Sequence, residues 1–212
     1  MGRYSHESAE VMPDQRTVYL TEDYDPGFFW KFVADRPRDL STGKLYAYQR
    51  EKAAWIAIKD VVNAHRAAER AGATKFVRLE DVKRGPDGAL YVAETGHFKW
   101  NDKFGRVLKL DPKTNRMTTF AEGDGTWLAQ PDNLVFDGQG RLLVCEDQYP
   151  ENVDQFGPNE LLRREPDGSW TRLLATAKGS EPSGPSFTPD MRQLYMSVLW
   201  GAKSGIVVLA GF

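Results

Sequence analysis

The feature that most constrains this chain of 212 residues is an internal repeat. Four segments each combine a turn rich in Pro, Asp and Gly with a short apolar run typical of a β-strand. These segments cover residues 12–23, 85–95, 136–147 and 188–198. The third and fourth copies each begin about 52 residues after their predecessor, and the first interval is longer by about 20 residues. A repeat of this length is typical of the blades of a β-propeller.

Further β-prone runs fill the intervals between the copies. They lie at 28–33, 44–48, 106–110, 117–120, 160–164 and 170–174. Four short strands per unit predict an all-β chain that forms a β-propeller of about 3.5 to 4 four-stranded blades. We place approximate blades at residues 1–50, 74–122, 131–177 and 184–212, so that 1–212 is one propeller domain or a partial one.

The number of blades bears on how the ring closes. Closed propellers have four to eight blades, because fewer leave exposed sheet edges. The alternatives are a four-bladed ring, a fragment of a larger ring, or two associating copies. We favour the fragment, whose partner would be a missing N-terminal half.

The additional residues of the first unit fall at 51–71. This segment is rich in Ala, Lys, Glu and Arg, and it carries Trp55, Ile58, Val61 and Val62 at helical spacing. The pattern predicts one inserted amphipathic helix that ends at Gly72. We expect His65 to lie on the solvent side of this helix.

Composition excludes several classes of protein. The 41% hydrophobic content is enough for a packed core, and a net charge of −2 does not indicate nucleic-acid binding. No apolar run approaches the ~18 residues of a membrane span, and the N-terminus carries no basic-then-apolar export signal. The single cysteine, Cys145, rules out an internal disulfide. Its apolar neighbours predict a buried, inert thiol.

Charged residues near the second repeat are the first candidates for chemistry. Arg78, Glu80, Asp81 and Glu94 lie on or beside short β-prone runs. A guanidinium can clamp an oxyanion such as phosphate, and carboxylates hold hard cations. An ion pair at a strand end would explain the same residues.

Several motifs together resemble the C-terminal half of the PhoX-type alkaline phosphatases, which are calcium- and iron-dependent β-propeller enzymes exported by bacteria. Residues 3–7, Arg-Tyr-Ser-His-Glu, resemble the Ser-His-Glu element of the family. Residues 71–82 resemble its Gly-Ala-Thr…Arg-Pro-Glu-Asp element, with Leu79 in place of proline. Residues 131–134, 145–147 and 184–190 resemble its later blades.

The resemblance implies particular roles. Glu7 and Glu80 would bind metal, Arg78 would face the phosphate, and the cofactors would be Ca²⁺ and Fe³⁺. The weaker metal candidates are Asp81, Glu94, Asn133, Glu146 and Asp147. The substrate would be a small phosphomonoester, and the location periplasmic or extracellular. The family's N-terminal half supplies further ligands, including a cysteine on iron, and nothing in this chain matches that half.

Three functions therefore remain open. The first is a metal-dependent phosphatase, in full or truncated form, in which Glu7, Glu80 and Arg78 converge. The second is a non-catalytic, calcium-stabilised propeller that serves as a binding or scaffold module. The third is a lactonase-like propeller hydrolase, which requires Glu7 and Asn133 to converge while Arg78 points away. Ser5 and His6 lack the Gly-x-Ser-x-Gly motif that would support a serine-hydrolase triad.

Overall fold

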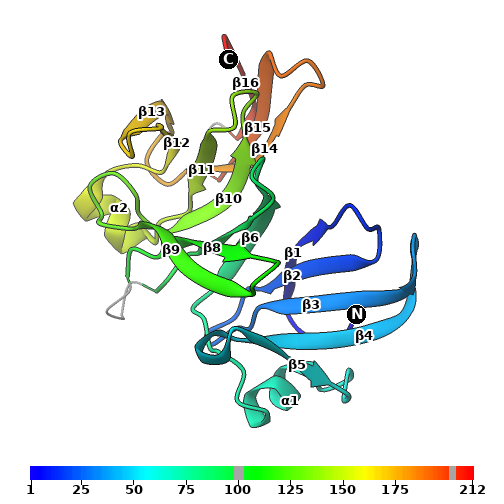
Figure 1. Cartoon of the computed structure of the whole chain (residues 1–212). Helices are drawn as coiled ribbons and strands as arrows, with labels where there is room; N and C mark the ends of the chain where they lie inside the picture. Colours follow the sequence, from blue (N-terminus) through cyan, green and yellow to red (C-terminus); the bar gives the residue numbers. More distant parts are fainter. Residues whose placement is uncertain (98–102, 201–203) are drawn as a thin grey trace. The chain divides into compact units, whose positions relative to one another are not determined.

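The computed structural model describes residues 1–97, 103–200 and 204–212. Its strands form four antiparallel sheets, and within each sheet consecutive strands are neighbours (Figure 1). The first sheet contains β1 (His6–Val11), β2 (Thr17–Glu22), β3 (Trp30–Arg36), β4 (Asp39–Gln49) and β5 (Ala54–Ile58). The second contains β6 (Leu79–Arg84), β7 (Leu90–Glu94), β8 (Arg106–Asp111) and β9 (Arg116–Glu122). The third contains β10 (Pro131–Phe136), β11 (Leu142–Glu146), β12 (Glu160–Arg164) and β13 (Trp170–Ala175), and the fourth β14 (Glu181–Phe187), β15 (Gln193–Leu199) and β16 (Gly205–Ala210). The predicted all-β, propeller-like class is confirmed.

The helix predicted over 51–71 is wrong in its first half. After the short 3₁₀ turn η1 (Arg50–Lys52), residues Ala54–Ile58 form strand β5, and only α1 (Ala64–Arg70) is helical. β5 pairs with β4 from Leu45↔Ile58 to Gln49↔Ala54. A short apolar run fits either period, and here pairing with a free strand edge decides the outcome. The second helix is α2 (Pro150–Phe156), and neither helix has the length and apolar character needed to cross a membrane among the described residues.

The chain divides into two compact units. Unit 1 comprises residues 1–94 and 108–119, and unit 2 comprises 95–107 and 120–212. In unit 1, strand β2 of the first sheet is buried on both faces. Successive side chains of a strand point to opposite sides, so β2 contributes to two hydrophobic clusters. Val18 and Leu20 belong to a cluster that also contains Ala64 and Ala68 of α1. Tyr19, between them, belongs to a second cluster with residues of β6 to β8.

In unit 2 a separate cluster joins the third and fourth sheets. Leu143 and Cys145 of β11 pack with Leu161 of β12 and with Leu194 and Met196 of β15. Cys145 is fully buried, as expected from its apolar neighbours.

A β-bulge lies in the first strand of every sheet. The register shifts between His6 and Ala9, between Leu79 and Val82, between Pro131 and Leu134, and between Ser183 and Ser186. Bulges are common next to functional sites because the additional residue re-aims a side chain. The repeat therefore provides an irregular position within each first strand.

Candidate metal and phosphate site

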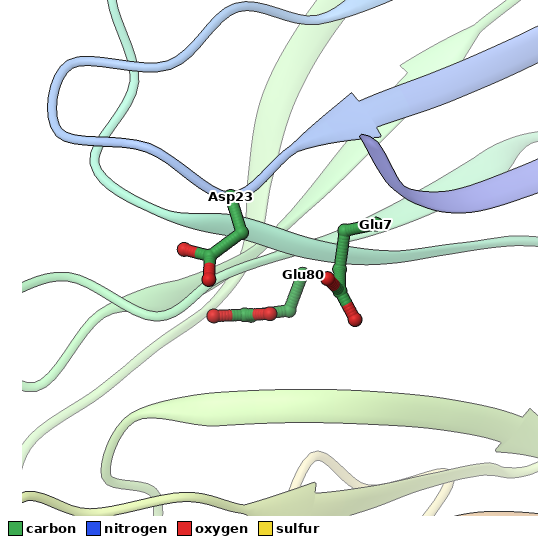
Figure 2. A group of neighbouring side chains, drawn as sticks. All are labelled: Glu7, Asp23 and Glu80. Carbon is green, nitrogen blue, oxygen red and sulfur yellow. The ribbon is translucent and has the colours of Figure 1, made fainter. Parts of the chain in front are cut away.

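Three carboxylates from separate segments meet in unit 1. Glu7 lies in the β1 bulge, Glu80 in the β6 bulge, and Asp23 directly after β2. One carboxylate oxygen from each lies within 4.8 Å of the others. Figure 2 shows the three side chains gathered at the end of β2. We call Glu7, Asp23 and Glu80 the first acidic group; Glu80 is buried, Asp23 partly exposed and Glu7 exposed.

Arg78 is directed into this group. Its Nη2 donates to Glu80 Oε1 at 2.5 Å, and its Nε donates to Asp23 Oδ1 at 3.0 Å. The backbone of Arg78 has φ +55°, a left-handed conformation that is energetically unfavourable for any residue with a Cβ atom. Strain of this kind persists where the surroundings impose it, and it is concentrated at functional sites.

The group carries more negative than positive charge. Partial desolvation of its carboxylate, followed by the charges of Asp23 and Asp81, raises the pKa of Glu7, and the Arg78 guanidinium acts in the opposite direction. Three carboxylates beside one guanidinium leave an excess of negative charge that a hard cation would neutralise. The arrangement brings Glu7, Glu80 and Arg78 together, as the phosphatase hypothesis requires.

The glutamates that end the second strands of the first three sheets have a structural role. Glu22, Glu94 and Glu146 face His6, Leu79 and Pro131 at the start of the neighbouring first strand. Each accepts a hydrogen bond from a loop amide: Glu22 from Phe28 N at 3.0 Å, Glu94 from Val77 N at 3.0 Å and Glu146 from Ala129 N at 2.7 Å. These buried carboxylates fix the loops, and Glu94 thereby holds the backbone next to Arg78.

The weaker candidates Asp81, Asn133 and Glu146 are all engaged in structural contacts. Asp81 accepts hydrogen bonds from Ser8 Oγ at 2.5 Å and Lys83 Nζ at 2.9 Å. Asn133 Oδ1 accepts one from Gly184 N at 2.6 Å and so links β10 to β14. For Glu146, burial raises the pKa to about 8. None of the three, nor Glu94, belongs to an acidic group among the residues that the structure describes.

Unit 2 contains a second acidic group, formed by Asp132, Asp147 and Glu181. Two of its members occupy the same positions in the repeat as members of the first group, whereas Glu181, before the bulge of β14, does not. Asp132 lies in the β10 bulge as Glu80 lies in that of β6, and Asp147 follows Glu146 as Asp23 follows Glu22. At the position of Arg78 the chain has Gln130, with φ +50°, whose Oε1 accepts a hydrogen bond from Tyr149 N at 2.7 Å. The backbone geometry is repeated, but the guanidinium is not.

Sequence reasoning missed Asp23, Asp132 and Glu181. Asp23 ends the first repeat at the same position as Asp147 in the third, so aligning the repeats would have indicated it. Asp132 stands beside the selected Asn133, and only the bulge decides which of the two reaches the group. Glu181 precedes the fourth repeat and had no signal of its own.

The family of the chain follows from comparison with known proteins. The family model described as "Alkaline phosphatase PhoX" matches residues 1–200. This chain belongs to the PhoX alkaline phosphatase family. No curated protein matches it at a significant level.

Solved structures show the same fold. PhoX of Pseudomonas fluorescens, in complex with the transition-state analogue vanadate, is 22% identical with a TM-score of 0.78, and the match covers 93% of this chain and 49% of that one. A gluconolactonase of Xanthomonas campestris is 15% identical with a TM-score of 0.60, covering 100% of this chain and 60% of that one. The periplasmic gluconolactonase PpgL of Pseudomonas aeruginosa is 14% identical with a TM-score of 0.55, covering 96% and 52%. The chain therefore spans about half to 60% of the length of these structures.

Proposed function

We propose that this chain carries part of the site of a metal-dependent phosphatase that hydrolyses phosphomonoesters. The observation that carries the proposal is the contact of Arg78 with both Asp23 and Glu80, inside a group of three carboxylates. A guanidinium directed into a cation-binding group is placed to bind an anion that also contacts the cation. Phosphate esters are such anions.

The residues of the first acidic group fit a hard cation. All three offer carboxylate oxygens, which suit Ca²⁺ and also Fe³⁺. The one cysteine of the chain is buried in a different cluster, in unit 2, and offers this group no thiolate. A bound cation would polarise phosphoryl oxygens and lower the pKa of a bound water molecule. We propose Ca²⁺ and Fe³⁺ as the ions, and a periplasmic or extracellular location, by analogy with the family.

The residues of the chain itself would orient the substrate. The left-handed backbone at Arg78 and the hydrogen bond from Val77 N to Glu94 fix the direction of the guanidinium. Two parallel N–H groups of an arginine match two phosphate oxygens. The Arg78 contacts with Asp23 and Glu80 would then be shared with, or replaced by, contacts to the ester. Glu7 is exposed and so can adjust its position when a cation binds.

The test combines metal analysis with hydrolysis of p-nitrophenyl phosphate. We expect hydrolysis that is lost on chelation and restored by Ca²⁺ with iron. Arg78→Met should lower kcat/KM at least about 100-fold, because it removes charge stabilisation of the transferring group. The same variant should retain its affinity for cations or bind them more tightly, since a competing positive charge is gone. Arg84→Met is the matched control, because Arg84 is exposed on the same strand.

Two other functions are outcomes of the same experiment. The lactonase-like structures make a lactonase the second candidate, and hydrolysis of gluconolactone without hydrolysis of the phosphate ester would favour it. That hypothesis requires Arg78 to point away, whereas Arg78 contacts Glu80. Calcium-dependent stabilisation without turnover of either substrate would instead favour a non-catalytic binding or scaffold module. It would also be the result if a further chain segment or a second copy is needed to complete the site.

A further inference from the structure

A pocket of unit 1 outside the first acidic group has its own set of polar side chains. It is lined by the N-terminal segment, the end of β2 and helix α1, with Arg3, Tyr4, Glu22, His65, Arg66 and Glu69 among its walls. Neither Asp23, Glu80 nor Arg78 lines it. His65 was expected to be a solvent-side residue, but its side chain is only 25% exposed.

His65 is held in a defined orientation. Its Nδ1 lies 2.8 Å from Glu22 Oε1, and the Glu22 side chain is almost fully buried. Glu22 also accepts hydrogen bonds from Phe28 N and Trp30 Nε1 at 3.0 and 3.2 Å. The imidazole ring contacts Phe28 and Tyr24 edge-on, with centroids 5.0 and 5.2 Å apart.

This arrangement fixes the role of each ring nitrogen. A carboxylate accepts hydrogen bonds, so Nδ1 carries the proton that faces Glu22. In the neutral ring, Nε2 is then an acceptor. Within the part of the chain that the structure describes, Nε2 has no hydrogen-bond partner, so it is available to a donor in the pocket.

The positive charges in the pocket walls are also available. Among the described residues, the side chains of Arg3 and Arg66 form no ion pair, whereas Glu22 is engaged with His65 and Glu69 with Lys75. The hydroxyl of Tyr4 is buried with no hydrogen-bond partner among the described residues. The N-terminal segment is held in place, because Arg3 N donates to Val61 O at 2.8 Å and Tyr4 stacks between His6 and Trp30.

We propose that this pocket is a second anion site that binds inorganic hydrogenphosphate. Arg3 and Arg66 bind the charged oxygens, and His65 Nε2 accepts the hydrogen bond from the protonated oxygen of the anion. Sulfate has no such proton, and neither has the dianion of a phosphate monoester. The pocket therefore selects the free anion over sulfate and over phosphate esters. This inference does not depend on the phosphatase activity.

The test measures binding by calorimetry at about pH 8, where a phosphate monoester is a dianion. The full chain carries Arg78→Met and chelator is present, so that neither the guanidinium nor a bound cation of the proposed phosphatase site contributes. We expect inorganic phosphate to bind at least about tenfold more tightly than sulfate or phenyl phosphate, as one lost hydrogen bond to a charged group implies. Equal binding of the three anions, or no phosphate binding at millimolar concentration, would overturn the proposal.

Three substitutions in α1, one of them a control, locate the site. Arg66→Met should weaken phosphate binding at least about tenfold, because a charge-assisted contact is lost. Arg70→Met is the matched control, since Arg70 lies one turn further along the helix and does not line the pocket. Identical affinities in the two variants would contradict the assignment. His65→Phe should abolish the preference for phosphate over sulfate. If that variant does not fold, the comparison of the three anions and the comparison of Arg66→Met with Arg70→Met still test the proposal.

Discussion

At the scale of residues, the repeat separates two kinds of carboxylate. Glutamates that end second strands are buried and accept hydrogen bonds from loop amides, whereas Glu7, Glu80 and Asp132 in the first-strand bulges belong to the acidic groups. The adjacent residues Glu22 and Asp23 illustrate the difference. Glu22 binds Phe28 N and His65, and Asp23 pairs with Arg78. Neighbours in an extended chain point in opposite directions, so one serves the fold and the other the site.

Glu146 gives a testable prediction about pH. Burial raises its pKa to about 8, above the ordinary value of an unfolded glutamate. Between those two pH values the folded state binds more protons than the unfolded state, so the free energy of unfolding falls as pH rises toward 8. The loss amounts to at most about 5 kcal/mol.

Denaturation with chelator present, between about pH 5 and pH 8, measures this effect. In Glu146→Gln the part of the pH slope due to this group should be absent, even if the variant is less stable at every pH. The exposed Glu51→Gln is the control and should keep the wild-type slope. An unchanged slope in Glu146→Gln would show that the carboxyl is ionised throughout.

At the scale of elements, the sheets depend on close backbone approaches that side chains would disturb. Gly43 lies within β4, opposite Ala34 of β3. A Cβ at Gly43 would lie 2.5 Å from Val33 O and closer still to the Phe32 ring. A backbone oxygen cannot give way without moving the strand, so glycine is required here for space.

Gly43→Ala should therefore destabilise the chain by about 1–3 kcal/mol, the usual cost of overpacking. Gly205→Ala is the matched control, because it also lies in a strand and a Cβ there would meet no atom within 4 Å. That change should be neutral or slightly stabilising. Urea denaturation of both variants measures the difference, and equal midpoints would contradict the packing argument.

At the scale of the whole molecule, each compact unit contains one acidic group among the residues that the structure describes, and Gln130 before Asp132 stands where Arg78 stands before Glu80. If both groups bind cations, Ca²⁺ stabilises the folded state by linkage, by about 2.7 kcal/mol at 100 times the dissociation constant. Glu80→Gln should reduce calcium-dependent protection from hydrogen exchange in β1, β2 and β6 and preserve it in β10, β11 and β14. Asp132→Asn should do the reverse. Calcium-independent exchange in both variants and in the wild type would exclude cation sites in the two units.

The all-β class and the repeated sheets were determined by the sequence itself, whereas Glu7, Glu80 and Arg78 were selected together through the resemblance of their motifs to the PhoX family. The repeat marks strands and turns through local backbone preferences. The Arg-Leu-Glu-Asp motif places a guanidinium and two carboxylates within four consecutive residues. Leu79, in place of the family's proline, lies in β6 and pairs with Glu94, so the strand remains extended there.

Tertiary structure decided what local pattern could not. The segment over 54–58 has apolar residues that suit a helix or a strand, and pairing with β4 selected the strand. Asp23 joins Glu80 across 57 positions of the sequence only because two sheets pack within unit 1. Likewise, burial of Glu22 beneath α1 converts His65 from an expected surface residue into an oriented acceptor. Strand and turn preferences act between near neighbours, whereas these contacts exist only once distant segments have packed together.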